Sequence, residues 1–362
     1  MGTSRPHPGI CLTPLPLPVS PTRWTRARLP RIMAAMRTRW FGRTNVAVSE
    51  IGLGCWQLGG ADWGNLDDQR AFDILAAAAD AGVTFLDTAD VYGAGRSETL
   101  VGEFLKTRRE SFFVATKLGR TAELYPDQYT EAGVRAATEA SLQRLQVEAL
   151  DLTQLHCVPP AVLQKGEIFD WLRQLQKEGK IKQFGASVET MDEAKLCLAQ
   201  PGLCSLQIIF NLFRQKPIVT LFDEAKKKQV GIIVRLPLAS GLLSGKLTKA
   251  HVFAANDHRN YNRDGQKFNV GETFAGLPFE KGVELADALK PLVPADWTLA
   301  DLAQRWLLDF DVVSTVITGA SRPEQATANA AVSRRPSLPA ELHQKLRDFY
   351  LREVAKHIRG PY

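Results

Sequence analysis

The sequence has neither a stretch long enough to cross a membrane nor a regular cysteine spacing. No apolar run reaches the roughly 18 residues that a membrane-spanning helix needs. The five cysteines are scattered and form no C-x-x-C pair, which argues against a disulfide framework and against a structural zinc site. We therefore expect no membrane partner and no metal, and a reducing, cytoplasmic compartment.

Lysine, aspartate and glutamate are absent from the first 49 residues, which carry eight arginines. Subtracting these from the totals of 45 basic and 39 acidic residues leaves 37 against 39, so the rest of the chain is close to neutral. The net charge of +6 therefore does not indicate a nucleic-acid-binding fold, and we expect no nucleic-acid partner.

Residues 1–36 also lack a periodic apolar pattern, and the first 30 contain seven prolines. Such a segment cannot form a long helix or pair into a sheet. A targeting peptide would share the excess of arginine but should be amphipathic, and a basic arm for a membrane or nucleic acid is a further alternative. We interpret 1–36 as a disordered extension and 37–362 as one folded domain.

That domain alternates short apolar strands with helices. A hairpin is predicted over 38–50, and about eight strand-helix units follow, which indicates a parallel sheet. An open doubly wound sheet would need a glycine-rich phosphate loop after its first strand, but here the bulky Cys55 and Trp56 follow Gly54. Eight units over roughly 300 residues favour an α/β fold of the (β/α)8 TIM-barrel type, with an extra C-terminal helix over 339–356.

Three further segments have predicted boundaries. Single helices are expected over 161–178 and 217–229, each rich in helix-forming residues. The segment from about 238 to 280 is expected to be irregular, and its polar part from 246 to 275 to close over a ligand.

Four reactive side chains follow three successive strands of the predicted barrel. Asp87 ends the first of these strands, Tyr92 lies five residues later, and Lys117 and His156 follow the next two strands. Singly, each has an ordinary explanation: a solvated lysine, a packed histidine, an aromatic plug, or a carboxylate paired with a cation. In a barrel, however, the carboxyl ends of the strands form one rim, where catalytic residues lie.

The chemistry that suits these four residues is carbonyl reduction. A tyrosine has a pKa near 10, and a neighbouring ammonium lowers it. We expect Asp87 to hold Lys117, Lys117 to lower the pKa of Tyr92, and Tyr92 to give a proton to a carbonyl oxygen. His156 would orient that carbonyl. The spacing of the four is not that of metal ligands.

The segments around these residues resemble the aldo-keto reductase family over about residues 37–335. The matching motifs are Asp87-Thr-Ala-Asp-Val-Tyr92-Gly, Ala115-Thr-Lys117 and Leu155-His156-Cys. The resemblance implies a (β/α)8 barrel, a small-molecule carbonyl substrate, and NADPH as the cofactor, with NADH as the alternative. It implies Tyr92 as the general acid.

The resemblance also places the cofactor along the later strands. It implies that Ser187 and Gln207 bind the nicotinamide carboxamide, that Arg235 stands where an aromatic ring commonly stacks on the nicotinamide, and that a loop from Gly241 to Lys246 binds the pyrophosphate. The full set of cofactor residues that it implies is Ser187, Gln207, Arg235, Leu238, Gly241, Leu243, Lys246, Gly319, Ser321, Arg322, Gln325 and Asn329.

Within that set, Ser321 and Arg322 would hold a ribose 2′-phosphate next to a helix N-terminus, which favours NADPH. The sequence departs from the family pattern at Val188, Arg235, Thr318 and Ala328. The charge of Arg235 would disfavour the positively charged oxidised nicotinamide, which bears on the direction of the reaction.

Trp56 and Trp63 follow the first strand, so they are expected either to wall an aromatic substrate pocket or to plug the barrel mouth. Two alternatives to a carbonyl reductase stay open: a cofactor-binding regulatory subunit on the same barrel, and an NADP-dependent dehydrogenase of sugars or polyols. The sequence does not predict an oligomeric state.

Overall fold

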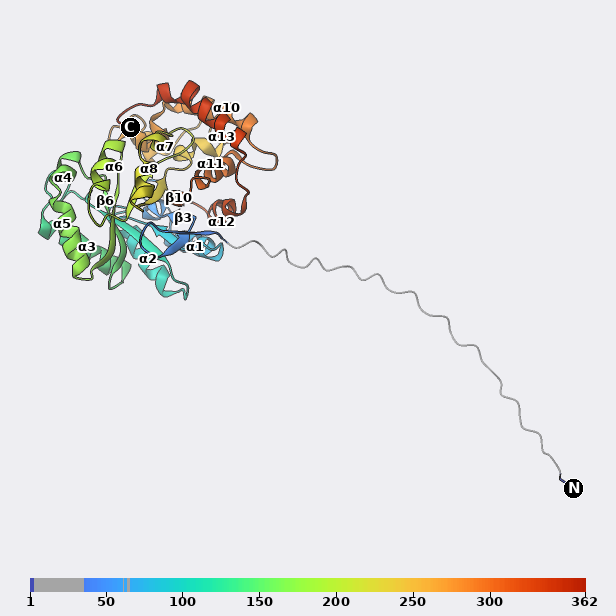
Figure 1. Ribbon diagram of the computed structural model, residues 1–362, viewed down its shortest axis with the longest axis horizontal. Coiled ribbons are helices and arrows are strands. Elements are labelled where there is room, and N and C mark those ends of the chain that lie inside the picture. Colours follow the sequence, from blue (N-terminus) through green and yellow to red (C-terminus); the bar gives the residue numbers. More distant parts are fainter. Residues whose placement is uncertain (3–35, 61, 64–65) are drawn as a thin grey trace. The chain divides into compact units, whose positions relative to one another are not determined.

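The computed structural model of the protein describes residues 1–2, 36–60, 62–63 and 66–362, and the expected extension over 1–36 falls almost wholly outside them. From residue 36 onward, eight parallel strands close into a barrel with helices outside it (Figure 1). This confirms the predicted (β/α)8 fold. In barrel order the strands are β10 (Val313–Gly319), β3 (Ile51–Gly54), β4 (Phe85–Asp87), β5 (Phe113–Leu118), β6 (Leu150–His156), β7 (Ile181–Ser187), β8 (Ser205–Ile209) and β9 (Gly231–Arg235).

The helices begin at the capping residues that the sequence supplies. The Asp67 carboxylate accepts a hydrogen bond from the backbone N–H of Arg70 at 2.7 Å, and Thr130 and Thr190 cap the third and sixth helices in the same way. The main helices are α1 (Asp68–Asp80), α2 (Arg96–Lys106), α3 (Glu131–Leu145), α4 (Pro160–Lys165), α5 (Glu167–Lys177), α6 (Met191–Leu198), α7 (Pro217–Thr220), α8 (Phe222–Lys227), α10 (Phe279–Leu289), α11 (Leu299–Leu308), α12 (Pro323–Ala331) and α13 (Ala340–Phe349).

Two predicted helices are each two helices in the structure. The helix expected over 161–178 breaks at Gly166, whose φ of 80° is left-handed and ends α4. The helix expected over 217–229 breaks at Leu221, whose φ of −134° is not helical. The predicted last helix runs only to Phe349 and continues as a π turn (Tyr350–Val354) and a 3-10 turn (Ala355–His357).

The segment between β9 and α10 has no strand and only short helical turns, as predicted. These are η2 (Ala239–Ser244), α9 (His258–Tyr261), η3 (Val270–Glu272) and η4 (Phe274–Gly276). No helix in the described part of the chain is both long enough and apolar enough to span a bilayer.

The predicted hairpin closes the end of the barrel where the strands begin. It consists of β1 (Thr38–Trp40) and β2 (Ala47–Ser49), which pair antiparallel. Phe41 in its turn is fully buried and packs against the rings of Phe85 and Phe113, with centroids 5.6 and 5.0 Å away. Gly42 has a φ of 53°, and a Cβ there would lie 2.8 Å from the backbone of Cys204, just before β8, and of Gly231 in β9, so only glycine fits. The carboxyl ends of the strands are therefore the open end.

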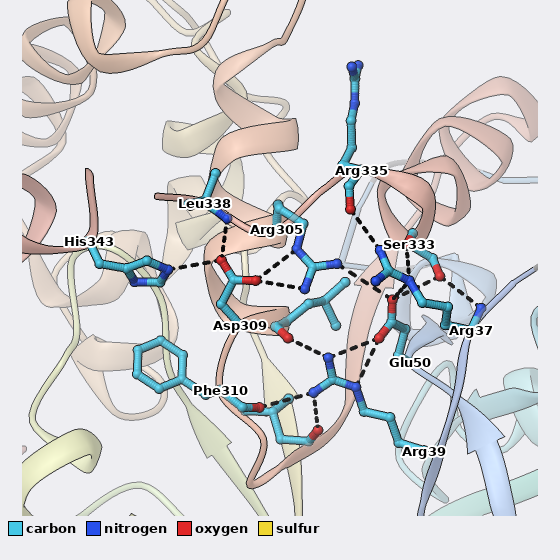
Figure 2. A network of polar contacts seen from close by, with 12 residues as sticks. Arg37, Arg39, Glu50, Arg305, Asp309, Phe310, Ser333, Arg335, Leu338 and His343 are labelled. Atoms are coloured by element: carbon cyan, nitrogen blue, oxygen red, sulfur yellow. Dashed lines mark hydrogen bonds and ion pairs between the residues drawn. The ribbon is translucent and has the colours of Figure 1, made fainter. Parts of the chain in front are cut away.

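A network of buried charges ties this hairpin to the last helices (Figure 2). Glu50 is 2% exposed and accepts hydrogen bonds from Arg39 and from Ser333, both at 2.9 Å. Arg305 of α11 lies 3.7 Å from Glu50 and 2.9 Å from Asp309, which in turn contacts His343 of α13 at 2.9 Å. Because each charge has a partner, the network can be buried, and it joins the first and last parts of the domain.

Candidate active site

Three of the four predicted catalytic side chains meet at the end of β4 and β5. The Lys117 ammonium lies 2.6 Å from an oxygen of Asp87 and donates to the Tyr92 hydroxyl at 3.1 Å. It also donates to the carbonyl oxygen of Thr88 at 2.8 Å. Lys117 is fully buried, and its neighbours, Asp87 first among them, hold its pKa above the usual lysine value against the opposing effect of burial. The carboxylate at the strand end therefore has the cationic partner that the sequence predicted.

The second oxygen of Asp87 is held by two amides. Gln207 of β8 donates to it at 2.7 Å, and Gln154 of β6 donates to it at 3.3 Å. The Ser187 hydroxyl reaches the Gln207 oxygen at 3.4 Å. Gln207 and Ser187, predicted to bind a nicotinamide, thus lie beside Asp87. Gln154 was not predicted, because an inward-facing glutamine in an apolar strand carries no signal in sequence alone.

His156 faces Tyr92 from the end of β6. Their ring centroids are 5.9 Å apart and the ring planes are nearly perpendicular. The ring is buried, and Nδ1 makes no hydrogen bond with the described residues. Burial, followed by the charges of Arg120 and Lys117, holds the pKa of His156 well below its usual value. The imidazole is therefore neutral near pH 7 and is able to donate or accept one hydrogen bond.

The structure changes the expected effect of Lys117 on Tyr92. Lys117 does favour the phenolate, as predicted, but burial outweighs it and raises the pKa of Tyr92 above its usual value. Tyr92 is thus a neutral phenol that is held next to an ammonium. Such a group keeps its proton at neutral pH, which suits a proton donor.

Asp90, between Asp87 and Tyr92 in the chain, is a buried acid without a partner. Its residue exposure is 6%, and neither carboxylate oxygen forms a hydrogen bond with the described residues. Burial and then the nearby charge of Glu98 raise the pKa of Asp90 to about 7. Glu98 itself is ion-paired with Arg144 at 2.6 Å, and the charges of Arg144 and Lys117, which lower the pKa of Asp90, are outweighed by burial and by Glu98. The turn that carries Tyr92 therefore contains a buried carboxyl group, that of Asp90, whose raised pKa leaves it partly protonated at neutral pH.

A cavity of about 660 Å³ opens above these residues at the carboxyl ends of the strands. Asp87, Tyr92 and His156 line it, while Lys117 lies beneath them. Of the other predicted residues, the cavity is lined by Trp56, Trp63, Ser187, Gln207, Arg235, Leu238, Gly241, Lys246, Gly319, Ser321, Arg322 and Gln325. Two predicted cofactor residues do not line it: Leu243 is fully buried in the core, and Asn329 accepts a hydrogen bond from Gln304 at 3.3 Å.

The cavity also carries groups that suit a phosphate-bearing cofactor. Lys246 and Arg322 line it, and neither has a carboxylate partner in the described part of the chain. Arg322 directly precedes α12, whose first residue is Pro323, so the helix N-terminus adds unpaired N–H groups. Gly241 has a φ of 99°, a left-handed conformation that lets the chain turn beside the cavity, and its own N–H donates to the carbonyl oxygen of Leu238 at 2.9 Å. Two unpaired cations and a helix terminus fit a dinucleotide with phosphate groups.

The cavity contains a charged cluster that the sequence did not predict. Glu272, from the irregular segment after β9, lies 3.3 Å from Arg120 and 3.7 Å from Arg235. Arg235 also donates to the carbonyl oxygen of Val188 at 3.1 Å. Burial disfavours the charge on Glu272, but Arg235 and Arg120 outweigh it and keep the pKa of Glu272 low. The charge of Arg235, which was expected to disfavour an oxidised nicotinamide, is thus partly balanced.

Glu189 and Cys157 complete the cluster. Burial and then the Glu272 carboxylate raise the pKa of Glu189 well above its usual value. Donor atoms of Cys157, Glu189 and Glu272 lie within 4.8 Å of one another, a spacing that could hold a metal. However, Arg235 contacts the Cys157 sulfur at 3.6 Å and both arginines contact Glu272, so cations of the chain itself already occupy this place.

The irregular segment reaches the rim next to β3. The Tyr261 hydroxyl donates to Asp62 at 2.6 Å, and the Trp56 indole donates to the other Asp62 oxygen at 3.0 Å. Trp56 stacks parallel to Tyr92 with ring centroids 5.8 Å apart, and Trp63 packs edge-on against Trp56. The two tryptophans therefore line the cavity and also fix the position of Tyr92 and of the crossing segment.

Comparison with known proteins finds similar sequences and structures over most of the chain. Residues 50–350 match the model of the aldo/keto reductase family. The aldo-keto reductase YhdN of Bacillus subtilis is 30% identical over 297 residues, which are 80% of this chain and 86% of that protein. The NADH-specific methylglyoxal reductase of Escherichia coli is 29% identical over 308 residues, 80% of this chain and 91% of that protein. The structure of glycerol dehydrogenase AKR11B4 from Gluconobacter oxydans superposes with a TM-score of 0.72 at 28% identity, covering 90% of this chain and 97% of that chain.

Proposed function

Because the chain belongs to the aldo/keto reductase family, we propose that it reduces aldehydes or ketones to alcohols with NADPH, and that Tyr92 is the proton donor. The observation that carries the proposal is the Lys117 ammonium, 2.6 Å from Asp87 and 3.1 Å from the Tyr92 hydroxyl, at the floor of the cavity. NADPH supplies the hydride when it is bound.

In this proposal the four residues have separate roles. Tyr92 donates its phenolic proton to the carbonyl oxygen of the substrate, and Lys117 stabilises the phenolate that results. Asp87 holds Lys117 in place and keeps it charged. His156, neutral, donates a hydrogen bond to the same carbonyl oxygen and sets its orientation. Trp56 and Trp63 pack against one another over this site and limit the entry of water.

The proposed cofactor contacts are those that line the cavity. Lys246 and the N–H groups around Gly241 hold the pyrophosphate, and Ser321 and Arg322 hold the ribose 2′-phosphate. Ser187 and Gln207 bind the nicotinamide carboxamide. The unpaired guanidinium of Arg322 supports NADPH over NADH, although a relative is named NADH-specific.

The test of this proposal is the variant Tyr92→Phe, which removes one oxygen and keeps the ring. We expect kcat for an aldehyde panel to fall by roughly 10²–10⁴-fold, the usual contribution of a positioned proton donor. Affinity for NADPH, measured by quenching of tryptophan fluorescence, should stay within twofold. Tyr350→Phe, which removes a hydroxyl bonded to Tyr362 in the C-terminal segment, is the matched control. Unchanged turnover in Tyr92→Phe would refute the proposal.

A second candidate is the oxidation of a polyol by the same site. The likeness to a glycerol dehydrogenase over 90% of this chain supports it. The same residues would then act in reverse, with Tyr92 as the phenolate that accepts the proton. Initial rates with NADP⁺ plus polyols, compared at equal pH with NADPH plus aldehydes, separate the two candidates.

A further inference from the structure

Arg120 lines the cavity and uses little of its hydrogen-bonding capacity within the described part of the chain. It lies three residues after Lys117 and has a side-chain exposure of 18%. In the described part of the chain its only hydrogen bond goes to Glu272 at 3.3 Å. The rings of Tyr125 and Phe268 lie 6.0 and 5.7 Å from the guanidinium carbon, so its position is set by aromatic contacts and by one carboxylate.

The cluster around Arg120 has more positive than negative charge. Arg120 and Arg235 are both cations, and they keep the pKa of Glu272 low against the effect of burial. Burial and the Glu272 carboxylate raise the pKa of Glu189, which disfavours a second negative charge. Two guanidiniums therefore face one carboxylate that is held ionised. Beneath them, Lys117 and Asp87 neutralise each other.

The remaining charges that line the cavity do not balance this excess. Lys246 and Arg322 are cations assigned above to the cofactor phosphates. Lys267 adds an exposed cation at the mouth and has no ion pair in the described part of the chain. Asp62, the remaining carboxylate of the lining, accepts hydrogen bonds from Trp56 and Tyr261 and offsets one positive charge, that of Lys267. Arg259 is paired with Asp257 at 2.6 Å and leaves the balance unchanged.

We infer that Arg120, with Lys267 at the mouth, forms a carboxylate-binding subsite, so that the preferred substrates are aldehydes or ketones that carry a carboxylate. This inference rests on the proposed function and names its substrate class. A planar guanidinium matches a carboxylate with two parallel hydrogen bonds. An anionic substrate would offset the surplus charge, whereas a neutral one would leave it desolvated in the filled cavity.

The test compares 4-oxobutanoate with its methyl ester, which has the same carbonyl and no charge. For the wild-type protein with NADPH we expect kcat/KM at least tenfold higher for the acid. In Arg120→Gln the value for the acid should fall by roughly 10–100-fold, the range of a charge-assisted hydrogen bond, and the acid-to-ester ratio should fall towards one. Arg120→Lys, which keeps the charge, should retain part of the preference.

Arg173→Gln is the matched control, because it removes an arginine paired with Asp170 on the outer surface of α5. It should keep the wild-type ratio. A wild-type ratio near one, or an Arg120→Gln variant with the wild-type ratio, would overturn the subsite while leaving the reductase proposal standing.

An equilibrium measurement covers the case in which neither compound is reduced. Calorimetric titration with 4-hydroxybutanoate, the alcohol of the acid probe, needs no turnover. Binding to the wild-type protein that is lost in Arg120→Gln would support the subsite even if the reductase proposal fails. No binding to the wild-type protein at millimolar concentration would overturn it.

Discussion

Asp90→Asn is expected to stabilise the protein in a way that depends on pH. Folding moves this carboxyl group from water, where its pKa is 3.8, to a buried place where it is about 7. A carboxyl group with a raised pKa binds its proton more tightly in the folded state. The folded state therefore loses stability as the pH rises from about 4 to about 7, and above that the loss is constant.

The magnitude follows from the two pKa values. For one proton, the linkage relation gives a loss of roughly 2 kcal/mol by pH 5 and roughly 4 kcal/mol by pH 8, a difference of roughly 2–3 kcal/mol. Asparagine does not titrate, so the free energy of unfolding of Asp90→Asn minus that of the wild-type protein should rise by roughly this amount from pH 5 to pH 8. The amide itself changes the free energy of unfolding by the same amount at pH 5 and at pH 8. This contribution therefore cancels when the two variant-minus-wild-type differences are compared.

The assay is urea unfolding followed by far-UV circular dichroism at pH 5 and pH 8, with refolding checked at both. Other titrating groups are common to the two proteins and drop out of the comparison. Asp311→Asn, which removes an exposed carboxylate, should differ from the wild-type protein by no more than about 0.5 kcal/mol at either pH. A difference for Asp90→Asn that is equal at the two pH values, or larger at pH 5, would refute the reasoning.

Two further predictions concern the cavity. Burial and the charges of Arg120, Lys117 and Arg235 keep His156 neutral. The pH profiles of kcat/KM for a neutral aldehyde should therefore have the same shape between pH 6 and 8 in the wild-type protein and in His156→Gln. An inflection in this range that is seen only in the wild-type protein would contradict the neutral ring. Because Glu272 balances Arg235, Glu272→Gln should weaken binding of NADP⁺ relative to NADPH by about fivefold, since one partner charge is worth roughly 1 kcal/mol there. Parallel fluorescence titrations with the two cofactors measure that ratio, and an unchanged ratio would argue against this balancing role.

The cluster of polar residues at the floor of the cavity could be predicted because its signal is local. A carboxylate that ends an apolar strand needs a partner, and parallel strands bring their carboxyl ends to one rim. Asp87, Tyr92, Lys117 and His156 therefore stood out by position alone. The helix breaks at Gly166 and Leu221 were not predicted. Glycine at 166 is a local signal, because it readily adopts the left-handed φ that ends α4, whereas Leu221 gives no such signal.

The charged cluster could not be predicted for a different reason. Glu272 comes from a segment without regular structure, and its contact with Arg120 spans 152 residues of sequence. Nothing local relates the two positions. The raised pKa values of Tyr92 and Asp90 are similar cases, since burial decides them and depends on what the whole fold places around the group. Charge balance within a cavity is a property of the assembled barrel.

The seam of the barrel has a consequence for synthesis on the ribosome. β3 pairs with β10, and Gly54 is paired with Gly319, which is synthesised 265 residues later. At a translation rate of roughly 5–20 residues per second, the edge of β3 that pairs with β10 stays unpaired for about 13–50 s. Unpaired strand edges invite pairing with other chains, and this edge is only four residues long and half glycine, which makes it a poor template. The shortness of β3 thus protects the nascent chain from pairing with other chains until β10 has been synthesised.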